Sequence, residues 1–113
     1  MIRLTPQLDY TTLVNASEFK ETLAQQEPPA SLEAPLRALW WDAHGNWERA
    51  HAEVDELETR PGMMVHAYLH RKNGEAGNAT YWYHRTGRPS QERSLADEWS
   101  ALLEELLSAS NKS

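Results

Sequence analysis

The sequence predicts an all-α fold, a compact bundle of about six helices. Apolar residues recur at three- and four-residue spacing in several segments, the pattern of a helix with one buried face. Asparagine, glycine and proline stand where such helices begin and end, and no segment has the alternation and turn residues of a β-hairpin. With 113 residues, 40% of them apolar and 25% charged, the chain has the length and composition of one globular domain.

The N-terminal part of the chain is expected to contain an arm followed by one helix. Residues 1–14 alternate weakly and contain a proline, which indicates an extended arm on the body of the domain. Asn15 is a suitable N-cap, and Glu18 follows at the spacing of a capping box. The adjacent prolines Pro28 and Pro29 are expected to end this helix.

Two helices are expected between residues 35 and 57. Pro35 suits the first helical position, Gly45 closes the first helix as its left-handed residue, and Asn46 caps the second. The apolar faces consist of Leu36, Leu39, Trp40 and Ala43 in the first helix and Trp47, Ala50, His51, Val54 and Leu57 in the second. The segment TRPG, residues 59–62, is predicted to be a turn.

Three more helices complete the pattern. One is expected to start at Met63 and to end at Gly74, and the next to begin at Asn78. The last spans residues 94–108, with an N-cap serine at its start, a stripe of leucines on its inner face and glutamates and aspartates on its outer face. The final segment SASNKS is expected to fray.

An internal repeat relates the two central pairs of helices. When residues 37–54 are placed over residues 66–83, with a constant offset of 29, small residues and glycines coincide. Small residues allow two antiparallel helices to approach closely, and glycine allows the tight turn between them. The coinciding pairs are Ala38 and Ala67, Gly45 and Gly74, and Ala50 and Ala79.

These matches carry a resemblance to known repeat families. GNWERAHAEV resembles the turn and second helix of a tetratricopeptide repeat, NATYWYHRTGRP is similar to the second helix of SEL-type repeats, and strings such as HAYLHRK resemble small bacterial proteins. The resemblance covers about residues 36–89. It implies two helical hairpins that are capped by the helices around Phe19 and Trp99. The first helix of each hairpin would contribute to a concave binding surface.

Composition and charge exclude several classes of protein. Because the chain has no cysteine, it has no disulfide, no thiol nucleophile and no cysteine-based metal site. A net charge of −6 argues against a nucleic-acid partner, since such domains usually present a basic face. No apolar stretch approaches a membrane span or a signal peptide, so we expect a cytoplasmic protein without a membrane partner.

The histidines are the sharpest candidates for chemistry. His66 and His70 lie four residues apart on an expected helix, so both imidazoles can face one divalent metal ion such as Zn²⁺ or Ni²⁺. His51 or Asp42 would supply a third ligand. The favoured alternative is structural: His70 occupies the aromatic position that Trp41 occupies one repeat earlier, and its nitrogens are hydrogen-bonded. The motif HxxxH also lacks the glutamate of a metalloprotease.

The chain has more large aromatic residues than its core needs. Neighbouring residues of a helix point about 100° apart. We therefore expect at least one member of each adjacent aromatic set to face outward or to lie in a groove, the sets being Trp40 with Trp41 and residues 81–83. Beside arginines, such rings suit an acidic peptide or an anionic small molecule, although plugs between short helices explain them equally well. The candidate binding surface comprises Trp41, His66, His70 and Arg71, with Trp82 and Arg85 at its rim.

The first functional hypothesis is therefore a non-enzymatic module that binds a protein or peptide partner. The second is a small-molecule or metal-binding protein that uses His51, His66 and His70. The third is a homodimer formed through the leucine stripe of the last helix or through exposed tryptophans. The sequence shows no nucleophile beside a base, no phosphate-binding loop and no pair of carboxylates in an apolar setting. Nothing in it therefore indicates an enzyme.

Overall fold

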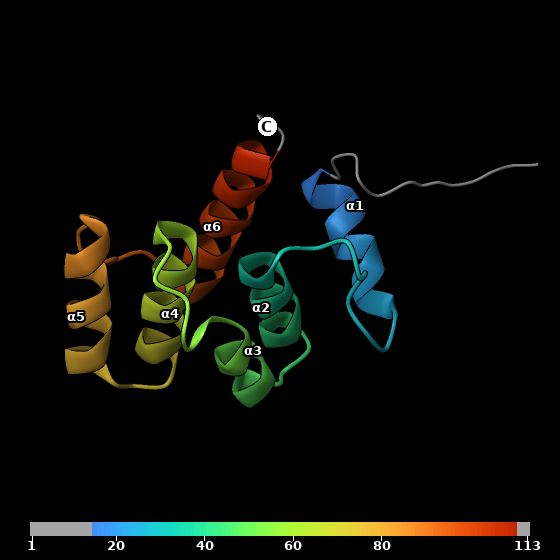
Figure 1. Cartoon of the computed structure of the whole chain (residues 1–113). Coiled ribbons are helices and arrows are strands. Elements are labelled where there is room, and N and C mark those ends of the chain that lie inside the picture. The colour runs from blue at the N-terminus through green and yellow to red at the C-terminus, as the bar shows by residue number, and fades with distance from the viewer. Residues whose placement is uncertain (1–14, 111–113) are drawn as a thin grey trace, which may run out of the picture.

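The protein is all-helical. The computed structural model describes residues 15–110, which form six α-helices and contain no strand (Figure 1). The expected arm of residues 1–14 lies outside the described part. The elements are α1 (Ala16–Glu21), a 3₁₀ turn (Thr22–Ala24), α2 (Ala34–Ala43), α3 (Trp47–Val54), α4 (Arg60–Lys72), α5 (Ala76–Thr86) and α6 (Leu95–Ser110). Within the described residues, no helix is long and apolar enough to cross a membrane.

The four central helices form two hairpins with the same turn. Helices α2 and α3 make the first hairpin, and α4 and α5 make the second. Gly45 and Gly74 close the turns with φ of 81° and 79°. The residue after each glycine donates its backbone N–H to an equivalent carbonyl, from Asn46 to Trp41 and from Glu75 to His70, both at 2.9 Å. The alanines aligned in the repeat are all buried, which confirms the prediction of two closely packed hairpins.

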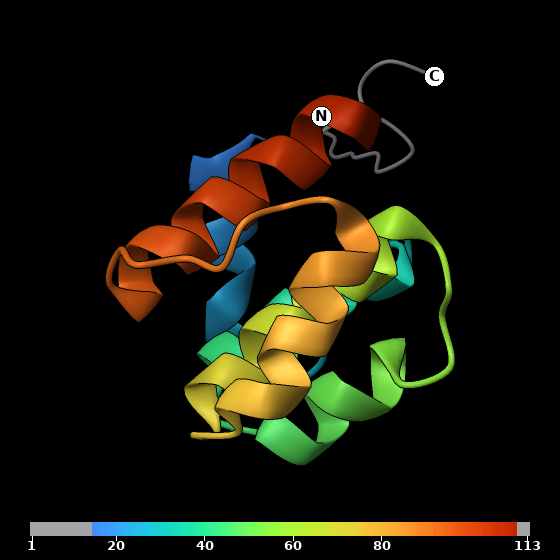
Figure 2. The same cartoon turned by 90° about the vertical axis from the view of Figure 1, so that its left-hand side faces the viewer.

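Helix α6 packs on the surface formed by the first helices of the two hairpins. It contacts α2 and α4 and runs along one side of the hairpins (Figure 2). Leu102 and Leu103 are fully buried there, and the indole Nε1 of Trp99 donates to the carbonyl of Leu39 at 3.1 Å. The concave surface expected to receive a partner is therefore filled by the chain's own last helix. Leu106 and Leu107 are also buried, so the leucine stripe is not available for a dimer interface.

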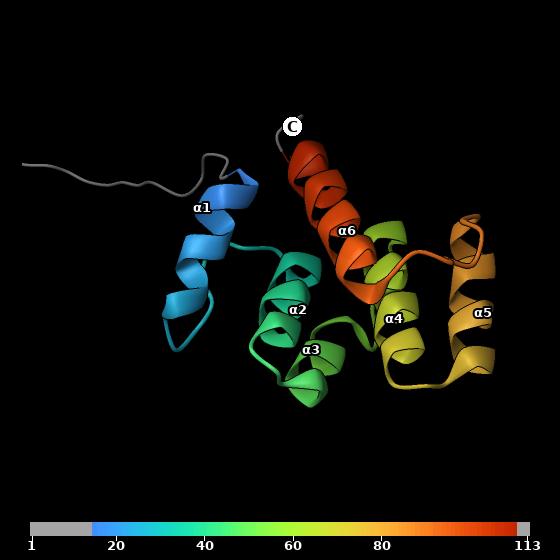
Figure 3. The same ribbon diagram turned by 180° about the vertical axis from the view of Figure 1, so that it is seen from behind.

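Helix α1 covers the same end of the domain from the N-terminal side. In Figure 3, α1 and the upper part of α6 lie beside α2, and α1 contacts α6. Phe19 is buried and meets the ring of Trp99 edge-on at 6.1 Å. In the 3₁₀ turn, the Thr22 hydroxyl accepts a hydrogen bond from Trp40 Nε1 at 3.0 Å. The two helices expected to cap the hairpins therefore pack on each other as well as on the core.

The caps predicted from sequence are present. Asn15 forms a complete capping box with Glu18. Asn46 accepts a hydrogen bond from the backbone N–H of Arg49, and Ser94 accepts one from that of Asp97. Each of these side chains satisfies a backbone donor that the first turn of a helix leaves without a partner.

Several boundaries differ from the expectation. Helix α1 ends at Glu21 and its 3₁₀ continuation at Ala24, before the prolines, and α3 ends at Val54, before Leu57. The TRPG segment is not a turn, because Thr59 caps α4 and residues 60–62 form its first turn. Gly62 is required there by packing, since a Cβ would lie 2.7 Å from Leu57 Cβ. Helix α5 begins at Ala76 rather than Asn78, because the turn at Gly74 leads directly into Glu75 as its N-cap. Helix α6 continues to Ser110, so the first residues of the expected frayed tail are helical.

Two buried carboxylates connect the helices. Asp42 of α2 accepts hydrogen bonds from the Tyr68 hydroxyl at 2.7 Å and from Lys72 Nζ at 2.8 Å. Glu98 of α6, which is fully buried, accepts from the Tyr83 hydroxyl at 2.6 Å and from Arg71 at 2.7 Å. Burial and the adjacent carboxylates raise the pKa of both tyrosines above its ordinary value, so both remain hydrogen-bond donors. The expectation that every acidic residue of α6 faces outward is wrong for Glu98.

Candidate functional site: a three-histidine cluster

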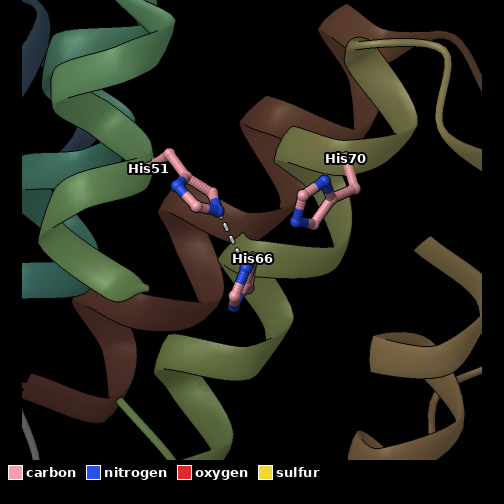
Figure 4. Close-up of side chains that lie close together, drawn as sticks. All are labelled: His51, His66 and His70. Atoms are coloured by element: carbon pink, nitrogen blue, oxygen red, sulfur yellow. Dashed lines mark hydrogen bonds between the residues drawn. The ribbon is translucent and has the colours of Figure 1, made fainter. Parts of the chain in front are cut away.

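Three histidines converge where the two hairpins meet. His51 projects from α3, and His66 and His70 project from consecutive turns of α4 (Figure 4). One ring nitrogen from each lies within 4.8 Å of the other two. The Nε2 atoms of His51 and His66 are 3.1 Å apart. In residues 15–110, no other group of three or more histidine, aspartate or glutamate side chains converges in this way.

Two tryptophans hold the rings in place. Trp47 of α3 stacks on His51 with ring centroids 4.8 Å apart and an angle of 10° between the planes, and its Nε1 donates to the carbonyl of Leu69 at 2.8 Å. Trp82 of α5 stacks on His66 at 4.2 Å and 20°. Each of these two imidazoles thus has one tryptophan stacked on it, which restrains the plane of the ring. The cluster is therefore pre-organised by three helices rather than by flexible loops.

A carboxylate orients His70. Its Nδ1 lies 2.6 Å from Oε1 of Glu75, the N-cap residue of α5. This hydrogen bond is the main reason why the pKa of Glu75 is lowered from its ordinary value. A neutral imidazole that donates from Nδ1 carries its free lone pair on Nε2, the tautomer that binds metal in carboxylate–histidine–metal arrangements.

His66 is the most buried member of the cluster. Only 3% of the residue is exposed, and its Nδ1 atom is buried without a hydrogen-bond partner. Burial lowers the pKa of His66 to about 4, with a further lowering from the positive charge that His51 and His70 can carry and a smaller opposing effect of Asp55. His66 is therefore neutral at pH 7, the protonation state that a metal ligand requires, and its Nε2 is hydrogen-bonded to that of His51.

The burial of His66 predicts a loss of stability in acid. The unfolded chain takes up a proton on His66 near pH 6.5, whereas the folded protein does so only at about pH 4. Between these pH values the unfolded state thus binds more protons than the folded state. Acidification from pH 7 to 4 should therefore lower the free energy of unfolding by about 3 kcal/mol through this residue. Urea unfolding of metal-free protein should show this loss, and His66→Phe should lack that part of it. Parallel pH profiles for the two proteins would contradict the assignment.

The spacing of the nitrogens is close to that of a metal-bound set. In a tetrahedral zinc site with Zn–N bonds of about 2.0–2.1 Å, neighbouring ligand atoms are about 3.3–3.4 Å apart. The His51–His66 separation of 3.1 Å already matches this value, and the widest separation of 4.8 Å needs a closure of about 1.5 Å. Because the tryptophans stack on His51 and His66, this closure would come from the His70 side chain, which Trp47 meets only edge-on. With that movement the cluster has the chemistry and dimensions of a three-nitrogen ligand set.

The remaining residues of the predicted binding surface do not form one exposed patch. Trp41 is buried under the guanidinium of Arg49, which lies 4.1 Å from its ring centroid. Because Trp40 is buried as well, neither of these two tryptophans faces outward, which leaves only the groove alternative of that expectation. Arg71 is bound by the buried carboxylate of Glu98, so it is not free to bind an anionic ligand.

The second half of that surface lies beside the cluster. Trp82 is half-buried against His66, and the Arg85 guanidinium lies over the Trp82 ring at 5.2 Å. Tyr81 is the exposed member of residues 81–83, as expected for that set. Asp42, the alternative third ligand, takes no part in the cluster because it is bound to Tyr68 and Lys72.

Three residues of the site were not identified from the sequence. Trp47 and Glu75 support the rings of His51 and His70, and the carboxylate of Asp55 lies 3.8 Å from His51 Nε2. Asp55 is four residues after His51, the same spacing that drew attention to His66 and His70, so this signal was available. Glu75 had no such signal, because its contact depends on the turn at Gly74.

Comparison with known proteins adds no assignment: no protein-family model, no curated protein and no solved structure matches this chain.

Proposed function

We propose that this protein binds one transition-metal ion through His51, His66 and His70, and that the ion joins the two hairpins. The observation that carries the proposal is the convergence of three imidazole nitrogens within 4.8 Å. Three rings that each can take up a proton repel one another when charged, and a bound cation gives their lone pairs a common partner. Imidazole ligands suit zinc, copper and nickel, whereas calcium and magnesium prefer oxygen.

The surrounding contacts support binding by neutral rings. Glu75 places the lone pair of His70 on Nε2, and burial keeps His66 neutral. A ligating histidine commonly has its other nitrogen bonded to a carboxylate in this manner. His51 comes from the first hairpin and the other two from the second, so an ion held by all three would link the hairpins.

Part of the surface assigned to a protein or peptide partner, the first hypothesis from sequence, is occupied by the chain itself. Helix α6 fills the surface of the first helices, Trp41 is buried and Arg71 is paired with Glu98. A partner on another face, the tetratricopeptide-like identity and the cytoplasmic location stay predictions.

The proposal is tested by metal stoichiometry. Untagged protein is dialysed separately against Zn²⁺, Ni²⁺ and Cu²⁺, and bound metal is measured by elemental analysis. We expect one ion per chain for the wild type and none for His70→Ala at the same free-metal concentration, because two imidazoles make a much weaker site. His84→Ala is the matched control, since His84 is exposed on α5 outside the cluster. Equal metal content in the wild type and His70→Ala would refute the proposal.

A further inference from the structure

The carboxylate of Asp55 stands beside the three histidines. Asp55 directly follows the last residue of α3 and lies four residues after His51, on the same side of the helix. Its Oδ1 atom is 3.8 Å from His51 Nε2, the atom that also faces His66. The negative charge of Asp55 is felt at His66 too, where it raises the pKa against the effect of burial.

Within the described residues, no arginine or lysine pairs with Asp55. Among residues 15–110, the only basic group within ion-pair distance of its carboxylate is His51 itself, although arginine and lysine pair with several other acidic residues of the domain. Glu75 is already bound to His70 Nδ1, and Asp42 to Tyr68 and Lys72. Asp55 is thus the acidic group at the cluster without a strong partner of its own.

The distance and exposure of Asp55 allow it to reach a bound ion. Three imidazole nitrogens occupy three corners of a tetrahedron, and a zinc–carboxylate bond is about 2.0–2.2 Å long, so the fourth ligand lies about 3.3–3.4 Å from its neighbours. The present distance to His51 Nε2 exceeds this value by about 0.5 Å. Asp55 lies outside the set of atoms that already converge within 4.8 Å, so its carboxylate has to turn toward His66 and His70 to complete the set. The side chain of Asp55 is 54% exposed, and rotation about its side-chain bonds meets little obstruction from the core.

We propose that Asp55 is the fourth ligand, which makes this a closed tetrahedral N₃O site for a divalent ion of the zinc or cobalt type. This inference rests on the proposed function. A site with four protein ligands holds its ion without an exchangeable water, the arrangement of structural rather than catalytic zinc.

Cobalt spectroscopy tests the fourth ligand. Co²⁺ is added to untagged wild type, to Asp55→Asn and to Glu56→Gln, and the visible d–d bands and the affinity are recorded with and without azide. Glu56→Gln removes the same charge from the neighbouring exposed residue. We expect intense tetrahedral bands in the wild type that azide does not change. Asp55→Asn should bind Co²⁺ at least about tenfold more weakly, since even residues that only support ligands matter by 10–100-fold, and azide should alter its spectrum.

Each outcome bears on one claim. If the wild type binds no Co²⁺ and no Zn²⁺, the metal function itself is wrong. If the wild type binds Co²⁺ but azide shifts its bands, and Asp55→Asn keeps the wild-type affinity, the ion is held by three histidines and an exchangeable water, and the assignment of Asp55 is overturned. If Glu56→Gln weakens binding as much as Asp55→Asn does, charge alone is responsible and the assignment is also overturned.

Discussion

Addition of Zn²⁺ at about 100 times its dissociation constant is expected to raise the melting temperature by about 10 °C. Ligand that binds only the folded state at this excess contributes about 2.7 kcal/mol, and a domain of this size gains roughly 4 °C per kcal/mol. The folded state alone binds well, because His51 and His66 belong to different hairpins and meet only when α3 packs on α4. The shift is measured by circular dichroism at 222 nm on untagged protein with and without chelator.

The controls separate the cluster from non-specific metal binding. His51→Ala should abolish the Zn²⁺ shift while the stacking of His66 on Trp82 remains. His84→Ala should preserve the shift, and Mg²⁺ or Ca²⁺ should produce none. A shift of the same size in His51→Ala would show that the two hairpins are not joined by the ion.

Replacement of Glu98 by alanine is expected to lower the free energy of unfolding by about 3–5 kcal/mol. Removal of one partner from a buried ion pair leaves the other without compensation. Here the Tyr83 hydroxyl would lose its acceptor inside the domain, and Arg71 would keep only its hydrogen bond to the Arg93 carbonyl. Urea unfolding at pH 7 measures the change. The loss should be large because typical stabilities are only about 5–15 kcal/mol.

Glu104→Ala is the matched control for this prediction. Glu104 lies on the same helix but on its exposed face, where a substitution usually changes stability by less than about 0.5 kcal/mol. Glu98→Gln keeps the size of the side chain but removes its negative charge and one of its two acceptor oxygens. In the wild type these two oxygens accept from Arg71 and from Tyr83. Equal stability of Glu98→Ala and Glu104→Ala would contradict the importance of the buried network.

Local signals explain why the hairpins were predictable from the sequence. Gly45 and Gly74 mark turns that only a residue tolerant of positive φ makes without strain, and Asn15 and Asn46 cap helices through contacts three residues away. The failure at TRPG has a physical reason: proline and glycine also suit the first turn of a helix, and the Thr59 cap together with the Gly62–Leu57 contact decided between the two.

The arrangement of the elements was less predictable because it depends on distant contacts. The sequence indicated an amphipathic last helix, but not that the side chain of Glu98 is buried. Its partners, Arg71 and Tyr83, are 27 and 15 residues away along the chain. For the site, the spacing of His66 and His70 predicted a shared face, and His51 was named beside Asp42 as a candidate third ligand; the structure places His51, and not Asp42, next to these two rings. Whether the rings face one another was decided by the angle at which α3 packs on α4.

The position of α6 has a consequence for the order in which contacts form during folding. Each hairpin closes on itself through a turn of a few residues, whereas the contact of Trp99 with Leu39 spans 60 residues of sequence. The entropy lost on closing a loop grows with its length, and local contacts form sooner than distant ones. We therefore expect the hairpins to form first and α6 to dock late, which would leave the apolar side of the hairpins open during that step.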